Sequence, residues 1–138
     1  MRINPKSRIV VDTNLWISFL ISKTVGELEN IIYNKNLIVL FSEELNFEID
    51  EVIKRPKFRK YFSSSDVNVI HEIQNSVGEN IDIKSQISIC RDIKDNFLLS
   101  LCRDGKADFL ITGDSDLLIM EKFEKTLIIN YRKFYELG

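Results

Sequence analysis

Two aspartates stand just after short apolar runs that are typical of buried strands. Asp12 follows the apolar residues 9–11, and Asp114 follows residues 109–112 with one glycine between. If these runs are neighbouring strands of a parallel sheet, both carboxylates project from the edge where such sheets bind ligands. The two positions therefore predict an acidic site at the carboxyl ends of two adjacent strands.

Two further acids fall on helix faces that should point into the protein. Glu48 lies three residues after Leu45 and four before Val52, so it shares the apolar face of its helix. Asp95 begins a similar inward-facing stripe at helical spacing. A buried carboxylate is costly unless it is paired or bound to a metal ion. We therefore expect one acidic site with these members: Asp12, Glu48, Asp95 and Asp114.

Each acid also has an ordinary structural interpretation. Asp12 and Asp95 could each cap a helix, because aspartate is a favoured N-cap residue. Asp114 could belong to a turn over residues 113–116, and Glu48 could be exposed by a small rotation of its helix. These alternatives stay open for each acid alone, whereas the placement of all of them favours a common site.

Clustered carboxylates point to hydrolysis that a divalent metal ion supports. Magnesium and manganese prefer hard oxygen ligands, and magnesium binds through a few carboxylates together with substrate phosphates. A bound ion polarises a phosphoryl oxygen and lowers the pKa of bound water. The sequence has no Walker lysine loop, and its one histidine, His71, is expected to be a solvated helix residue. Its cysteines, Cys90 and Cys102, are too few for a disulfide scaffold and are expected to be free.

The elements that must position these acids alternate between strands and helices. Apolar runs without polar alternation suit parallel strands that are covered on both faces. Such runs are expected at residues 8–11, 37–41, 109–112 and 127–129, with a weaker one at 81–83. Helices are expected over residues 15–22, 25–34, 67–77 and 97–102, together with one that Ser42 caps and Pro56 stops. This order predicts an α/β fold on a mainly parallel sheet, in a single domain over residues 1–138.

Several segments together resemble the PIN domain. They are Val-Val-Asp-Thr-Asn at residues 10–14, Ser-Glu-Glu-Leu at 42–45 followed by Glu48, and residues 91–98 and 107–118. The resemblance covers nearly the whole chain, and within the family it is strongest to bacterial PIN toxins of the virulence-associated protein C type. It implies a three-layer α/β/α sandwich and RNA cleavage that depends on magnesium or manganese. It also implies a homodimer and an antitoxin protein that silences the toxin.

The resemblance assigns roles to residues at matching positions. The catalytic and metal-binding residues that it implies are Asp12, Glu48, Asp95 and Asp114, with Asp116 as an accessory metal ligand. The supporting residues that it implies are Thr13 and Thr112, through their hydroxyls, and Asn14, which would order the turn. The sequence departs from the family pattern at Ile93, where proline is common, and at Ser100, where alanine is common. Neither departure touches a proposed ligand.

A basic stretch with interleaved aromatic residues follows the expected helix that carries Glu48. Its members are Arg55, Lys57, Phe58, Arg59, Lys60 and Tyr61. Basic side chains beside aromatic ones suit phosphate contacts and base stacking, so the four cations are predicted to bind RNA. The alternative is a solvated helix and loop that Phe58 and Tyr61 anchor to the core.

The net charge of −2 argues mildly against a nucleic-acid binder, since such proteins are often strongly basic. Gathering several acids in one metal site would leave the rest of the surface free to be locally basic. The sequence shows no apolar signal segment and no run of about twenty apolar residues. A cytoplasmic protein that does not act at a membrane is therefore expected.

Two other functions use the same residues. In a phosphatase of the haloacid-dehalogenase type Asp12 would be the nucleophile, but that chemistry needs a second aspartate where Asn14 stands. A non-catalytic module that binds RNA or protein on the same fold could also retain the acids. The sequence favours a metal-dependent endoribonuclease that hydrolyses RNA phosphodiester bonds, as the toxin of a toxin–antitoxin system.

Overall fold

A six-stranded sheet carries the fold in the computed structural model, which describes residues 2–137. Its strands are β1 (Arg8–Val11), β2 (Ile38–Phe41), β3 (Gly78–Asn80), β4 (Phe109–Ile111), β5 (Lys122–Phe123) and β6 (Thr126–Ile129). They lie in the order β3-β2-β1-β4-β6-β5, and each neighbouring pair is parallel except the β5–β6 hairpin. The predicted mainly parallel sheet is confirmed.

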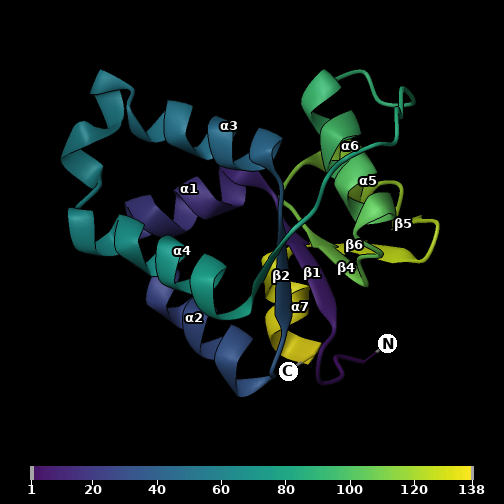
Figure 1. The fold of residues 1–138 in the computed structure, drawn as a ribbon, viewed down its shortest axis with the longest axis horizontal. Coiled ribbons are helices and arrows are strands. Elements are labelled where there is room, and N and C mark those ends of the chain that lie inside the picture. The colour runs from purple at the N-terminus through teal and green to yellow at the C-terminus, as the bar shows by residue number, and fades with distance from the viewer. Residues whose placement is uncertain (1, 138) are drawn as a thin grey trace.

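Helices cover both faces of this sheet (Figure 1). They are α1 (Thr13–Ser22), α2 (Val25–Asn34), α3 (Glu43–Ile53), α4 (Ser64–Val77), α5 (Ile93–Asp104), α6 (Ser115–Leu118) and α7 (Tyr131–Leu137), with a 3-10 helix η1 (Pro56–Tyr61) between α3 and α4. In Figure 1, α5 lies on the opposite side of β1 and β2 from α1, α2 and α4. The predicted three-layer α/β/α architecture is confirmed.

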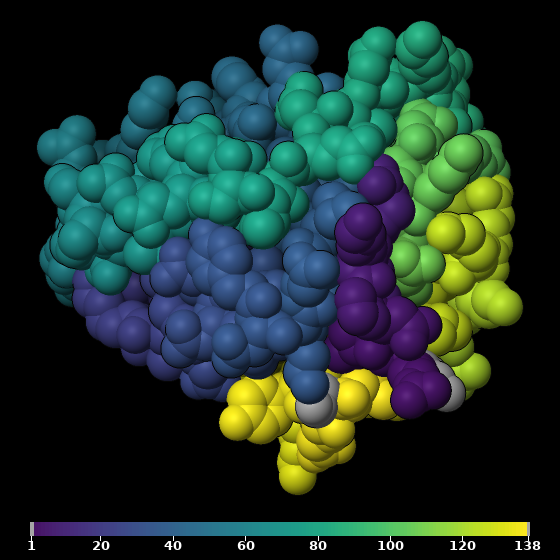
Figure 2. Space-filling view, turned by 60° about the horizontal axis from the view of Figure 1, so that its bottom comes forward, coloured from purple at the N-terminus to yellow at the C-terminus, as the bar shows by residue number. Residues whose placement is uncertain are grey.

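The central strands are buried on both faces, as runs without polar alternation predict. Ile9, Val10 and Val11 of β1 are all fully buried. The space-filling view in Figure 2 shows the N-terminal part of the chain, in purple, lying between a blue segment and the green and yellow C-terminal half. This position agrees with the place of β1 between β2 and β4.

The direction in which strands are added to the sheet reverses between β1 and β4. From β1 the chain builds outward to β2 and β3, and it then returns to place β4 on the other side of β1. Val11 and Ile111 end these two strands in register with one another. Open parallel sheets form a crevice at such a reversal, beyond the carboxyl ends of the strands. The residues that follow β1 and β4 therefore face a common crevice.

Side-chain caps begin the helices around this edge. Ser42 accepts a hydrogen bond from the Leu45 backbone at 3.1 Å and begins α3 directly after β2. Asp92 accepts one from the Lys94 backbone at 2.9 Å and begins α5. Such caps satisfy N–H groups that the first helical turn leaves unpaired.

One predicted strand is wrong in position. The apolar run 81–83 was expected to pair, but the edge strand β3 occupies Gly78–Asn80, immediately after α4. The Ile81 backbone still donates to the Phe41 carbonyl at 2.7 Å, after which Ile81 and Ile83 pack against the core from outside the sheet. Their apolar character therefore reflects burial and not strand pairing.

The remaining expectations for single residues are simpler. Cys90 and Cys102 are free, and His71 is exposed on α4, as predicted. Within residues 2–137, no helix has both the length and the apolar character needed to cross a bilayer.

Candidate metal centre at the carboxyl edge of the sheet

Asp12 lies at the end of β1 and is tied to the strand beside it. One carboxylate oxygen accepts the Asn14 backbone N–H at 3.2 Å, which caps α1. The other oxygen accepts the Thr112 hydroxyl at 2.7 Å, and that hydroxyl in turn accepts the Asp114 N–H at 3.1 Å. Only 6% of Asp12 is exposed. The buried Thr112 hydroxyl therefore links the acid after β1 to the acid after β4.

Three acids from two elements converge beside this link. Asp95 lies in the first turn of α5 and is 4% exposed, while Asp114 and Asp116 lie at the start of α6. One carboxylate oxygen from each residue lies within 4.8 Å of the others. Asp114 is also the N-cap of α6, where it accepts the Asp116 N–H at 2.9 Å. A single cation placed among these oxygens would contact carboxylates from both segments.

Glu48 approaches the same site from α3. Its side chain is 26% exposed and lies 3.9 Å from the Lys94 ammonium of α5. Burial raises the pKa of Glu48, while Lys94 and a hydrogen bond from Thr13 oppose the rise. The negative charge of Asp12 raises the pKa of Glu48 further, because a nearby carboxylate disfavours a second negative charge.

Asp95 and Asp12 also have pKa values above the ordinary value of an aspartate. Burial, then the hydrogen bond and charge of Asp114, raises the pKa of Asp95 to about 7. Burial is also the main reason that the pKa of Asp12 is raised, with the charges of Asp114 and Asp92 adding to it. Carboxylates packed this closely repel one another, and a bound cation would relieve that repulsion.

The donor set fits magnesium or manganese. Every side chain in the cluster offers hard carboxylate oxygens, which these ions prefer over sulfur or imidazole ligands. Asp95, Asp114 and Asp116 are the residues whose oxygens lie close enough to hold one ion together. Asp12 flanks them and interacts with Asp95 and Asp114 through its charge, and the charge of Asp12 acts in turn on Glu48.

The structure thus brings the sequence-predicted acids to one edge of the sheet. The expectation that Asp95 caps a helix is wrong, because Asp92 is the N-cap of α5 and Asp95 stands within its first turn. Asp12 does cap α1, as its structural alternative held, and it does so while lying beside the three clustered acids. Thr13 and Thr112 are buried beside the acids, whereas Asn14 contributes its backbone N–H and has an exposed side chain.

Sequence reasoning missed three neighbours of the cluster: Arg91, Asp92 and Lys94. Arg91 pairs with Asp116, and Lys94 lies beside Glu48. The charge of Asp92 acts on Asp12, Glu48 and Asp95. Asp92 had a readable signal, since an aspartate three residues before another acid suits a helix N-terminus.

The basic stretch, which consists of Arg55 and the 3-10 helix η1 that follows it, lies between α3 and α4. Its four cations, Arg55, Lys57, Arg59 and Lys60, are exposed, and no carboxylate of residues 2–137 lies within ion-pair distance of them. Phe58 packs against the core, as the structural alternative expected, whereas Tyr61 is 38% exposed. Lys57 and Lys60 lie over the Phe58 and Tyr61 rings at 5.0 and 5.2 Å. The predicted cations are therefore unpaired and accessible to a ligand.

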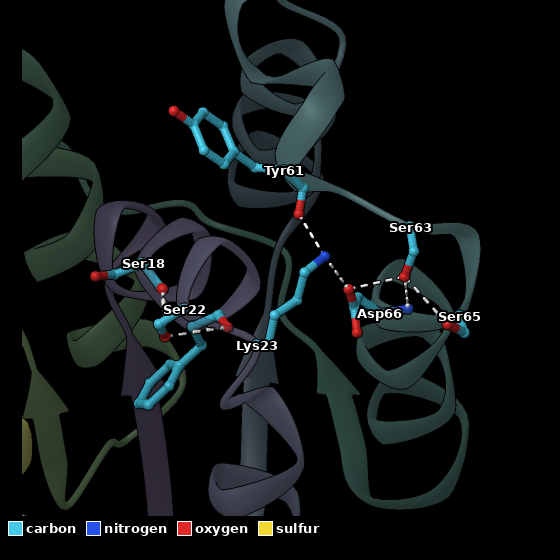
Figure 3. Close-up of polar contacts among 8 residues, drawn as sticks. Ser18, Ser22, Lys23, Tyr61, Ser63, Ser65 and Asp66 are labelled. Carbon is cyan, nitrogen blue, oxygen red and sulfur yellow. Dashed lines mark hydrogen bonds and ion pairs between the residues drawn. The ribbon is translucent and has the colours of Figure 1, made fainter.

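Figure 3 shows how the end of η1 is held in place. The Lys23 ammonium, just after α1, donates to the Tyr61 carbonyl at 2.6 Å and to the Asp66 carboxylate at 2.7 Å. Ser63 caps α4 by accepting the Asp66 N–H at 3.2 Å, and its hydroxyl donates to the Asp66 carboxylate at 2.7 Å. One lysine thus joins α1, η1 and α4, which fixes the basic stretch to the rest of the fold.

Comparison with known proteins places the chain in a family. A family model described as the PIN domain matches residues 8–116. An uncharacterized protein of Methanocaldococcus jannaschii is 30% identical over 128 residues, which cover 91% of this chain and 82% of that protein. The crystal structure of VapBC2 from Rickettsia felis, bound to a DNA fragment from their promoter, is similar in fold at 15% identity. Its TM-score is 0.58, over 89% of this chain and 98% of the matched one. The chain therefore belongs to the PIN-domain family.

Proposed function

We propose that the protein is a magnesium- or manganese-dependent endoribonuclease and the toxin of a toxin–antitoxin pair. The observation that carries the nuclease assignment is the convergence of acids from four segments of the chain beyond β1 and β4. Membership of the PIN-domain family supports it, because PIN domains are generally nucleases. The acids in question are Asp12, Glu48, Asp95, Asp114 and Asp116.

The chain's own residues would divide the work between holding a metal ion and holding RNA. Asp95, Asp114 and Asp116 hold the ion, with Asp12 and Glu48 at its border. A divalent ion in such a site polarises the phosphoryl oxygen and lowers the pKa of bound water. Thr112 keeps Asp12 and Asp114 in fixed relation through its two hydrogen bonds.

The basic stretch would supply the contact with RNA. Arg55, Lys57, Arg59 and Lys60 are exposed and unpaired among the described residues, so they are free to contact phosphates. Tyr61 offers an exposed ring on which an unpaired base can stack. Single-stranded RNA offers the exposed bases and the flexible backbone that these two kinds of contact require.

The toxin assignment rests on relatives and on surface character. The Rickettsia felis structure with a similar fold is of VapBC2 bound to promoter DNA. We propose an antitoxin protein and a second copy of the chain as partners. Exposed apolar side chains near the acidic site would suit burial by a protein partner: Phe47, Ile93 and Phe97. We also propose that the protein acts in the cytoplasm.

The other two functions remain outcomes of the test. A phosphatase has less support, because the family match covers residues 8–116 and the exposed Asn14 stands where a second acid is needed. A binding module would bind RNA without cleaving it. These functions differ in what they do to RNA and to a phosphomonoester, so one assay separates them.

The decisive variant is Asp12→Asn. Asparagine can still accept the Asn14 N–H and ranks with aspartate as an N-cap, so the fold should remain intact. It lacks the charge that favours a bound ion, so cleavage of single-stranded RNA in Mn²⁺ should fall by at least about 100-fold. Gel assays of RNA cleavage, with and without EDTA, measure this beside circular dichroism.

A matched control uses the same substitution at the other edge of the sheet. Asp108 stands before β4 and accepts the Arg8 N–H at 2.8 Å, far along the strand from the acids. Asp108→Asn should retain cleavage. Full activity of a folded Asp12→Asn protein would falsify the metal-nuclease proposal. Hydrolysis of a phosphomonoester but not of RNA would favour the phosphatase. For the toxin assignment, induced wild-type protein should arrest bacterial growth and Asp12→Asn should not.

A further inference from the structure

The acidic site poses an electrostatic problem for RNA binding, because its carboxylates repel phosphates. The ion pairs recorded for the site's acids involve Arg91 and Lys94. Arg91 lies just before α5 and Lys94 lies in its first turn, and they contact acids from different elements, α6 and α3. They therefore lie at two sides of the cluster, where an approaching RNA strand would meet them.

Arg91 forms an ion pair with Asp116, one of the three clustered acids. Its Nη2 donates to both oxygens of Asp116, at 2.8 Å each. Asp116 is one of the acids whose oxygens lie within 4.8 Å of one another. The guanidinium takes one lone pair of each Asp116 oxygen, and its positive charge opposes a second cation at the same carboxylate. The Arg91 side chain is 86% exposed, so it can leave Asp116 without disturbing the core.

Lys94 makes a looser contact on the other side. Its ammonium lies 3.9 Å from Glu48, at the upper limit of an ion pair, and its side chain is 59% exposed. It also lines the groove between α3 and α5, together with Phe47 and Phe97. Exposed pairs of this kind are weak, so Lys94 is easily diverted to another anion.

The backbone that carries Arg91 and Lys94 is held by a helix cap, whereas their charged side chains are exposed. Asp92, between them, caps α5 through the Lys94 N–H at 2.9 Å. The next site acid, Asp95, follows Lys94 directly and is buried. The two cations thus extend from a capped helix terminus that also carries the proposed metal ligand Asp95.

We propose that Arg91 and Lys94 position the RNA phosphates, after serving as counterions of Asp116 and Glu48 in the metal-free protein. When Asp116 and Glu48 take part in a metal site, their cations are released and turn to the RNA backbone. This inference rests on the proposed nuclease function. It assigns to the two residues a role beside the acids themselves, next to a groove that Lys94 shares with Arg55 of the basic stretch.

The first test measures metal binding without RNA. Because Arg91 competes for Asp116, Arg91→Gln should bind Mn²⁺ about two- to five-fold more tightly than the wild type, as removal of a weak competing pair allows. A purely structural role for Arg91 predicts the opposite sign, since loss of a structural contact loosens the site. The matched control is Arg103→Gln, which removes an exposed arginine paired with Glu124 at the far end of α5. That control should leave the affinity for Mn²⁺ unchanged in calorimetric titrations.

The second test measures RNA binding at several salt concentrations. Ca²⁺ also binds carboxylate oxygens, so a single-stranded RNA oligonucleotide is titrated in Ca²⁺, with gels to verify that it stays intact. Each lost phosphate contact should lower the slope of log K against log salt by about 0.7. The double variant Arg91→Gln, Lys94→Gln should therefore bind RNA more weakly and with a shallower slope, whereas Arg103→Gln should match the wild type.

The outcomes separate this inference from the function on which it rests. The inference is overturned if Arg91→Gln binds Mn²⁺ no more tightly than the wild type, or if the double variant keeps the wild-type salt slope. Cleavage by the wild type in Mn²⁺ would still support the nuclease in that case. If the wild type binds RNA but never cleaves it, the nuclease proposal fails, and changed salt slopes still support the two cations as phosphate ligands.

Discussion

At the scale of single residues, capping a helix and belonging to an acidic site are compatible roles. Asp12 accepts the Asn14 N–H with one oxygen and the Thr112 hydroxyl with the other. Asp114 likewise caps α6 while one of its oxygens belongs to the cluster. Each carboxylate oxygen has more than one lone pair, so a hydrogen bond leaves room for a cation. The caps hold the carboxylates in place before any ion arrives.

The raised pKa of Asp95 predicts how stability depends on pH without metal. In the fold its pKa is about 7, against an ordinary value of 3.8, so the folded protein binds its proton more tightly than the unfolded chain does. The free energy of unfolding should therefore fall as pH rises from about 4 to about 7. In Asp95→Asn this loss should shrink by on the order of 1–3 kcal/mol, because asparagine does not ionise.

Urea unfolding in EDTA at a series of pH values measures this dependence. The raised pKa values of Asp12 and Glu48 act in the same direction, so Asp95→Asn should keep a residual slope. If the wild type and Asp95→Asn lose stability in parallel between pH 4 and 7, the interpretation of Asp95 as a strained buried acid is wrong.

At the scale of elements, apolar periodicity predicted the central strands and the longer helices but not the short elements. The run ahead of Asp12 became β1 because its apolar residues Ile9, Val10 and Val11 are buried between helix layers. The edge strand β3 has the sequence Gly-Glu-Asn, which carries no strand signal, and it pairs because α4 delivers its backbone beside β2. Short elements of this kind form because of the elements packed beside them, so the local sequence pattern cannot predict them.

The site, too, has residues that the sequence pattern could predict and residues that it could not. Glu48 and Asp95 could be predicted because a carboxylate on an apolar helix face is unusual. The pairs Arg91–Asp116 and Lys94–Glu48 could not, because their partners lie on other elements and their relative placement depends on how α3, α5 and α6 pack. Exposed cations have no periodicity that would reveal such a contact.

The basic stretch η1 gives a prediction about RNA binding. Replacing Arg55, Lys57, Arg59 and Lys60 with alanine should weaken binding of single-stranded RNA, because fewer counterions are released. The slope of log K against log salt should fall by as much as about 3. Metal affinity should not change, since these side chains are paired with none of the acids among the described residues. Fluorescence anisotropy at several salt concentrations provides the measurement.

A control with the same change in net charge uses exposed lysines elsewhere. Replacing Lys6, Lys106, Lys122 and Lys133 with alanine removes as many positive charges outside η1. If both sets lower the slope equally, RNA responds to overall charge and η1 has no special role. If neither does, the stretch is a solvated surface segment that Phe58 anchors.

At the scale of the whole molecule, the small net charge conceals an uneven distribution. The chain carries −2 overall, yet the acids of the site gather beyond β1 and β4, while the unpaired cations of the basic stretch lie on the connection from α3 to α4. The crevice exists because β1 and β4 are neighbours in the sheet. After β1 the chain adds strands on one side of β1, and it then returns to add β4 on the other side. Strand order is a property of the complete fold. From the sequence, the convergence of Asp12 and Asp114 could therefore be predicted only on the condition that their strands are neighbours.

The same organisation predicts that a divalent ion stabilises the whole fold. An ion that binds the folded protein and not the unfolded chain adds about 2.7 kcal/mol of stability at one hundred times its dissociation constant. For a chain of 138 residues this should raise Tm by several degrees. The shift in Mn²⁺ should grow as pH rises toward 7, because Asp95 must lose its proton to act as a ligand. Thermal scans with Mn²⁺ and then excess EDTA measure the rise and its reversal.

Paired variants identify where such an ion acts. Asp108→Asn, at the opposite edge of the sheet, should show the wild-type rise in Tm, whereas Asp12→Asn and Asp95→Asn should show little of it. In EDTA, Asp95→Asn should melt at or above the wild-type temperature near pH 7, because one member of a mutually repelling group has been neutralised. Asp95→Asn should therefore show both effects: an equal or higher Tm in EDTA, and little rise in Tm when Mn²⁺ is added. An Asp95→Asn protein that keeps the full Mn²⁺ shift would place the ion outside this cluster.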